Sequence, residues 1–135
     1  MNEEQDKTLC AKYPNLYRDR NESMYSTCMC WGFSCGPGWY NIIDELSAKL
    51  EAEIVLLKEG FEGDPSNLPA AAQVKEKFGG LRFYMTSSTD TMQKAIADAE
   101  DKSYLTCEDC GEEGKERTDR GWIRTLCEKC NKERK

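Results

Sequence analysis

Four cysteines in the C-terminal part of the sequence have the type and spacing of a metal site. Cys107 and Cys110 form one Cys-x-x-Cys pair, and Cys127 and Cys130 form a second pair after sixteen intervening residues. Two such pairs can present four thiolates to one tetrahedral ion, and this spacing is typical of structural zinc. Because four protein sulfurs leave no open coordination position, such a site stabilises a fold and catalyses nothing by itself. The sequence therefore predicts one bound zinc ion; the alternatives are iron on the same thiolates, two disulfides, or four thiols without a ligand.

A second set of four cysteines lies in the N-terminal part of the sequence: Cys10, Cys28, Cys30 and Cys35. They could hold a second metal ion if the segment around Cys10 folds back, although Cys-x-Cys is a less usual ligand pair than Cys-x-x-Cys. Free cysteine is also among the most buried residue types, so the four could instead be small core residues around Trp31 and Trp39. A redox pair at Cys28 and Cys30 is the third alternative.

The composition limits the chemistry that the chain can perform. The 135 residues suit one domain, or a core with a small appendage, and they include no histidine. The commonest general base and the nucleophile pairs that depend on it are therefore absent. Aspartate and glutamate are plentiful, but none forms a recognisable catalytic pair. We predict no catalytic residue, and an enzyme such as a carboxylate-metal nuclease is the less favoured class.

Cysteine usage and hydropathy indicate a cytoplasmic protein. The first residues are acidic and polar, unlike a secretory signal, and no apolar run approaches the roughly 20 residues of a membrane helix. Eight cysteines without a signal sequence are typical of a reducing compartment, where cysteines bind metals more often than they form disulfides.

The charge balance disfavours non-specific binding to nucleic acid. The formal net charge is −6, whereas affinity for phosphates depends mainly on lysine and arginine. Two groups of bases still stand out, one at Lys75, Lys77 and Arg82 and one at Lys129, Lys132, Arg134 and Lys135. A nucleic-acid-binding regulator that uses these two groups is the alternative function.

Periodic apolar residues predict two helices in the part of the chain before the metal site. Over residues 39–60 they recur at the three- and four-residue spacing of an amphipathic helix, which Gly60 would end. A second amphipathic helix is predicted after residues 88–91, which offer several N-caps, and it leads directly into Cys107.

Residues 74–85 predict a β-hairpin between these helices. Their apolar and polar residues alternate in the manner of two strands, and Gly79 and Gly80 would form a two-residue turn. A helix that starts near Pro69 and ends at Gly79 is the alternative for this segment.

These elements predict a small α+β fold. Residues 1–9 would be a flexible tail, and residues 10–105 a core of two amphipathic helices and a β-hairpin. Residues 106–135 would be a four-cysteine zinc module packed on this core, with the knuckle, hairpin and helix of a treble clef or zinc ribbon.

Exposed aromatic and basic residues are the candidates for binding a partner. Aromatic surface is concentrated at Trp31, Phe33 and Trp39, between glycines that allow tight turns. The basic candidates are Lys75, Lys77, Arg82, Lys129 and Lys132.

Much of the chain resembles a group of small uncharacterised phage and prophage proteins. The most specific part is the string from Val74 to Tyr84, and further matches lie at residues 28–33, 36–39 and 121–124. The group more often has aspartate at the position of Pro37. The resemblance implies a phage origin, and with it the cytoplasm of a host cell, but no particular chemistry.

A second resemblance covers only the last 29 residues. The two cysteine pairs with their neighbours look like the zinc finger of the DksA/TraR-type regulators, which act on bacterial RNA polymerase. The long coiled coil of that family is missing here, so the resemblance implies zinc ligands and not the polymerase mechanism.

These observations favour a zinc-binding accessory protein of phage type that binds and modulates a host or phage protein. Acidity, the lack of histidine, a closed metal site and the aromatic content all favour binding over catalysis. The candidate targets are the transcription machinery and anti-phage defence.

Overall fold

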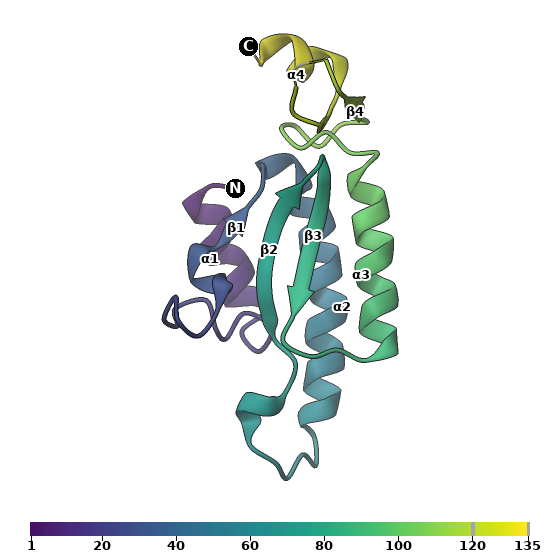
Figure 1. The fold of residues 1–135 in the computed structure, drawn as a ribbon. Coiled ribbons are helices and arrows are strands. Elements are labelled where there is room, and N and C mark those ends of the chain that lie inside the picture. Colours follow the sequence, from purple (N-terminus) through teal and green to yellow (C-terminus); the bar gives the residue numbers. More distant parts are fainter. Residues whose placement is uncertain (120, 135) are drawn as a thin grey trace.

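The structure, a computed structural model, describes residues 1–119 and 121–134 and confirms a mixed α+β fold (Figure 1). A three-stranded sheet lies against two long helices, and a smaller module with a two-stranded sheet covers one end of this core.

The α-helices are α1 (Glu3–Lys12), α2 (Tyr40–Lys58), α3 (Asp90–Ser103) and α4 (Glu128–Glu133). The strands are β1 (Phe33–Ser34), β2 (Ala71–Lys77) and β3 (Gly80–Met85) in the core, and β4 (Lys115–Arg117) and β5 (Arg124–Leu126) in the module. Short 3₁₀ helices occur at η1 (Cys28–Trp31), η2 (Pro37–Trp39) and η3 (Pro65–Asn67).

The core sheet has one apolar face and one polar face. Its central strand β2 is parallel to β1 and antiparallel to β3, so that Val74 pairs with Phe33 and with Phe83. All three of these side chains are buried. The next pair along, Lys75 and Arg82, points to the opposite side, because successive side chains of a strand alternate between faces.

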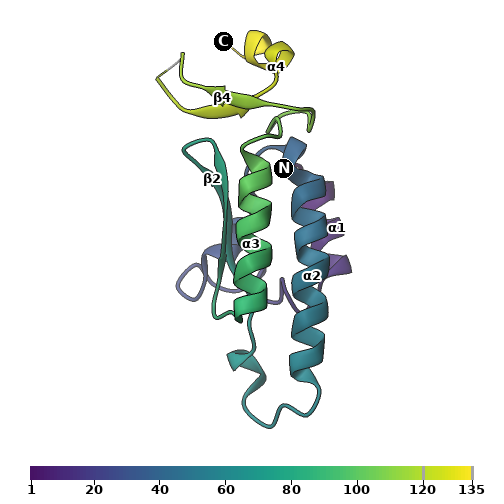
Figure 2. The ribbon, with the colours of Figure 1, turned by 90° about the vertical axis from the view of Figure 1, so that its right-hand side faces the viewer.

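Helices α2 and α3 pack side by side against the apolar face (Figure 2). The fully buried core residues include Ile43, Leu50 and Ile54 of α2, Met92 of α3 and Leu81 of β3. Both helices occur where the apolar periodicity predicts them. Among the described residues, no helix combines the length and the apolar character that crossing a membrane requires.

The segment after α2 is a hairpin, as predicted, but its turn lies one residue earlier than the glycine pair suggests. Lys77 pairs with Gly80, so the two turn residues are Phe78 and Gly79, with φ angles of 53° and 84°. Gly80 is the first residue of β3, and the ring of Tyr104 explains why it is glycine: a Cβ at Gly80 would lie 2.4 Å from the tyrosine hydroxyl. The sequence does not reveal this long-range contact.

The flexible tail expected at residues 1–9 is wrong, because the chain forms α1 there. Asn2 and Gln5 form a capping box at its start, and Leu9 is fully buried in the core. Asp6 forms an ion pair with Arg20 at 2.7 Å. A single buried leucine on a charged helix gives little periodic signal, so the sequence alone indicated a tail.

The strained turn allows a stability prediction. Phe78 has a left-handed backbone conformation, which costs a bulky residue about 1–2 kcal/mol and which asparagine adopts more easily. We expect Phe78→Asn to raise the free energy of unfolding by about 1 kcal/mol, measured by urea denaturation. Leu105→Asn also removes an exposed apolar side chain, but from a residue without positive φ, and should give no such gain. A loss of stability in Phe78→Asn would contradict the turn assignment.

Candidate metal centre

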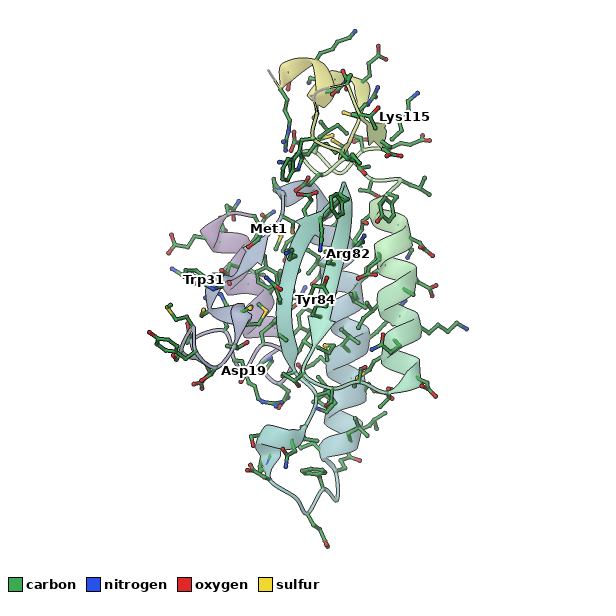
Figure 3. All side chains as sticks on the ribbon, in the orientation of Figure 1. Met1, Asp19, Trp31, Arg82, Tyr84 and Lys115 are labelled. Carbon is green, nitrogen blue, oxygen red and sulfur yellow. The ribbon has the colours of Figure 1, made fainter. Side chains whose placement is uncertain are left out.

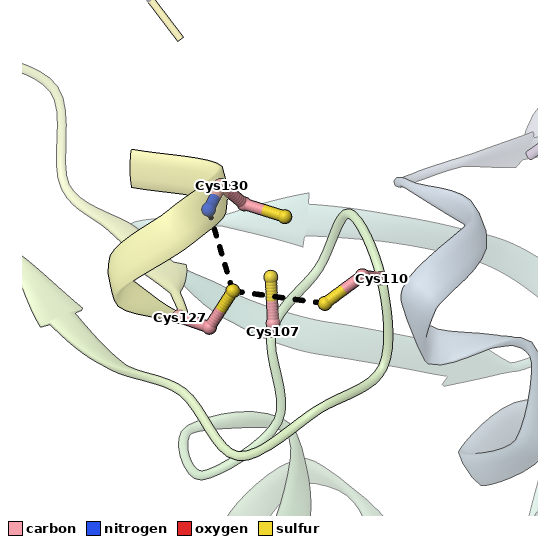
Figure 4. A group of neighbouring side chains, drawn as sticks. All are labelled: Cys107, Cys110, Cys127 and Cys130. Carbon is pink, nitrogen blue, oxygen red and sulfur yellow. Dashed lines mark hydrogen bonds between the residues drawn. The ribbon is translucent and has the colours of Figure 1, made fainter. Parts of the chain in front are cut away.

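The four C-terminal cysteines converge on one point (Figure 4). Their sulfurs all lie within 4.8 Å of one another, and Cys110 Sγ is 3.7 Å from Cys127 Sγ. Zinc–sulfur bonds of about 2.3 Å in a tetrahedron place neighbouring sulfurs about 3.8 Å apart, which matches that separation. Within residues 1–119 and 121–134 this is the only group of three or more cysteine, histidine or acidic ligands that close together. The donor set therefore fits one zinc ion.

Each cysteine pair is held by the local structure that its sequence dictates. In the first knuckle, Gly111 donates its N–H to the carbonyl of Cys107 at 2.9 Å and has a φ angle of 85°, which glycine adopts without strain. In the second pair, Cys127 is the N-cap of α4, and its sulfur accepts the N–H of Cys130 at 3.4 Å. The module thus has the predicted order of knuckle, short hairpin and terminal helix.

The surroundings of the sulfurs make the thiols unequal. The N–H of Cys130 and the neighbouring thiols lower the pKa of Cys127 to about 7. Burial raises the pKa of Cys130, and the neighbouring thiols add to this effect. Because the thiolate is the form that binds metal, binding of an ion to this site would displace protons from thiols such as that of Cys130.

The first knuckle packs directly on the loop that leads into α2. Gly38 donates its N–H to the carbonyl of Glu108 at 2.7 Å, and the indole of Trp39 donates to the carbonyl of Thr106 at 2.9 Å. A Cβ at Gly38 would lie 2.2 Å from the carbonyl oxygen of Cys107. Only glycine allows this approach, which explains the Gly36-x-Gly38-Trp39 pattern in a part of the chain far from the cysteines.

A buried carboxylate between the cysteines of the first pair joins the module to the core. Glu108 is 2% exposed; its Oε2 accepts the N–H of Gly36 at 2.8 Å and its Oε1 lies 3.3 Å from Arg124 Nη1. Arg124 also reaches Glu76 of β2 at 3.4 Å. Sequence reasoning missed Glu108, because an acid within a Cys-x-x-Cys pair looks the same whether it faces solvent or the core.

The module also contacts the hairpin turn. Thr125 of β5 is fully buried and donates its hydroxyl to the carbonyl of Gly79 at 2.6 Å. A Cβ at Gly79 would lie 3.1 Å from Cγ2 of Ile123. The metal module is therefore packed against both the α2 entry loop and the β2–β3 turn.

The structure does not bring the second set of cysteines together as a metal site. Cys10 donates its thiol to Asp6 in α1 at 3.5 Å, Cys28 is exposed, and Cys35 is buried in the core. Burial raises the pKa of both Cys10 and Cys35 to about 12. These two thiols are thus neutral. Cys35 is a small buried core residue, as one of the predicted alternatives for the N-terminal cysteines proposed.

The residues predicted to bind a partner divide into buried and exposed ones. Phe33 and Trp39 are 7% and 0% exposed, so they are core residues and this part of the prediction is wrong. Trp31 is 65% exposed, and Lys77, Lys129 and Lys132 are also exposed, whereas Lys75 and Arg82 are half-buried on the polar face of the sheet.

Two bases of the group at the C-terminal end, Lys132 and Arg134, have acidic partners, and Lys135 lies outside the described residues. Arg134 donates two hydrogen bonds to the carboxylate of Asp109, which lowers the pKa of that carboxyl group. Lys132 forms a surface ion pair with Glu128 at 3.3 Å. In sequence these residues read as a cluster of bases, but their acidic partners lie beside them in the fold.

No family model, curated protein or solved structure matches the chain. The comparisons therefore support neither the resemblance to phage proteins nor that to DksA/TraR-type zinc fingers, and both stay predictions. The four-cysteine cluster stands on the geometry alone.

The close approach at Gly38 can be tested by adding one methyl group. We expect Gly38→Ala to push the knuckle off the core and to lower the free energy of unfolding by about 1–3 kcal/mol. It should also speed zinc release to a chromogenic chelator. In the control Gly63→Ala the nearest neighbour of the new Cβ is the exposed ring of Phe61, so little change is expected. Equal behaviour of the two variants would contradict the proposed docking.

Proposed function

We propose that the protein is a zinc-stabilised binding protein that acts by binding another protein. The proposal that zinc stabilises the protein rests on the convergence of four sulfurs within 4.8 Å, those of Cys107, Cys110, Cys127 and Cys130. Four thiolates close the coordination shell of a zinc ion, so the ion holds the module together and offers no position to a substrate. Zinc is favoured over iron because paired knuckles of this spacing are its commonest structural use.

Exposed apolar residues at the end of α2 support the proposal that the protein binds another protein. Val55, Leu56 and Leu57 are 42%, 64% and 37% exposed, and Phe61, in the loop that follows, is 41% exposed. We call these four residues the apolar end of α2. Exposed apolar side chains concentrated in one segment are a feature of protein interfaces. This surface lies at the opposite end of the molecule from the metal module (Figure 1).

The proposal keeps the phage-type role that the sequence resemblance suggests. An accessory protein of this kind would act in the cytoplasm of a host cell, where thiolates stay reduced and available to zinc. Its candidate targets are the host transcription machinery and anti-phage defence proteins. Its own module would supply stability and shape, while the partner would supply the activity that is modulated.

The proposed interface is tested by placing one charge on it. We expect Leu56→Asp to abolish co-purification of a stoichiometric partner from bacterial lysate, because a desolvated carboxylate at an apolar interface is strongly unfavourable. The control is Leu105→Asp, which puts the same charge on a leucine of similar exposure in the segment between α3 and the metal module. It should keep the partner.

Native mass spectrometry of the purified protein separates a foreign partner from self-association. A particle with one chain is expected. A homodimer that Leu56→Asp dissociates would contradict the proposal, because the apolar end of α2 would then be covered by a second copy. Retention of the partner by Leu56→Asp would also contradict it.

A further inference from the structure

The polar face of the core sheet carries three cations and no acid at its described outward positions. These positions are Ser34, Gln73, Lys75, Lys77, Gly80, Arg82 and Tyr84. None of the three cations forms an ion pair with another described residue. Figure 3 shows Arg82 and Tyr84 on the side of the sheet that α2 and α3 leave open.

This face contrasts with the rest of an acidic molecule. The chain has 25 acids and 19 bases, and α2 alone contains Asp44, Glu45, Glu51 and Glu53. A hydrogen bond with Tyr104 and the charge of Glu100 on α3 raise the pKa of Arg82 on this face. The Oε2 atom of Glu100 accepts the N–H of Phe83 at 3.1 Å. Charge is therefore segregated: the helical side is acidic and the open sheet face is basic.

Three exposed aromatic rings lie in or close to the hairpin turn in the chain or in space, and each has a cation beside it. Lys77 Nζ lies 5.6 Å from the ring centroid of Phe78, and Arg82 Cζ lies 5.9 Å from that of Tyr104. Arg124 Cζ lies 6.0 Å from the ring of Trp122. The three rings are 64%, 38% and 61% exposed.

The conformation of Phe78 is a separate indication that this surface binds something. A phenylalanine in the left-handed region costs stability at a turn that asparagine would suit better, and its ring gains no burial in return. Strained residues of this kind cluster at binding sites, where their side chains serve a ligand. We call Lys75, Lys77, Arg82 and Tyr84, with Phe78, Tyr104 and Trp122, the basic–aromatic surface.

We propose that the basic–aromatic surface binds a single-stranded nucleic acid. Cations that neutralise phosphates and rings that stack on bases are the two components of such sites, and open sheet faces with exposed aromatics are a known platform for unstacked bases. An acidic peptide would use the cations but would leave the rings without a role. A three-stranded sheet with strands about 4.8 Å apart is too broad for a duplex groove about 12 Å wide once its side chains are included.

The test is fluorescence anisotropy with a labelled twelve-nucleotide oligo(dT) or oligo(U) strand. If the three cations each contact one phosphate, affinity should fall about 20-fold between 50 and 200 mM salt. Lys75→Glu/Lys77→Glu should lower affinity at least about tenfold and flatten the salt dependence. The matched control Lys49→Glu/Lys94→Glu makes the same change in net charge at exposed lysines of α2 and α3, and should bind like the unmodified protein.

Phe78→Asn provides a second readout that a folding defect cannot mimic. It should be more stable than the unmodified protein and yet bind the strand more weakly, because it relieves the turn and removes a stacking ring. Zinc content and thermal unfolding of all variants confirm their fold.

Three results would overturn the proposal. The first is no anisotropy change at 50 mM salt, and the second is equal weakening by the control pair. The third is competition by polyglutamate as effective as that by the unlabelled strand, which would identify an acidic protein as the occupant instead. None of these results bears on the apolar end of α2, so the protein-binding role would stand or fall separately.

Discussion

The contact between the first knuckle and Gly38 determines how the metal module is joined to the core. The carbonyl of Cys107 lies where a Cβ at Gly38 would be, and the same carbonyl accepts the N–H of Gly111 inside the knuckle. A metal ion bound by Cys107 would therefore fix the backbone on which the α2 entry loop rests. Glu108, buried between the two ligands, extends this dependence to Arg124 and through it to the hairpin.

The buried core of the module is too small to stabilise the module without a metal ion. The buried apolar cluster of the module consists of Cys107, Leu126 and Cys130, and two of these three are ligands. So small a core cannot offset the conformational entropy of about 29 residues. Zinc binding contributes on the order of 10 kcal/mol to the folding of isolated modules, which is comparable with the whole stability of a typical domain. The core of α2, α3 and the sheet is larger and has its own buried cluster, so we expect it to keep its fold when the module loses its metal.

The sequence predicted what local spacing controls. The four ligands were recognisable because Cys-x-x-Cys pairs are local motifs, and α2 and α3 because their apolar residues repeat over many turns. What failed depends on contacts between distant segments. The ring of Tyr104 explains the glycine at position 80, which looked like a turn residue, and the core buries Trp39 and Phe33, which as isolated aromatics looked like a partner surface. Glu108 became visible only when its partners Gly36 and Arg124 were placed beside it.

The most direct test of this account is native mass spectrometry, combined with metal analysis, of protein purified without added metal. The account predicts one zinc ion per chain, lost when Cys110 is replaced by serine, with the core still folded. Two metal ions per chain would contradict the finding that the N-terminal cysteines do not form a metal site. A folded module with no metal would contradict the central claim that the module depends on its metal ion.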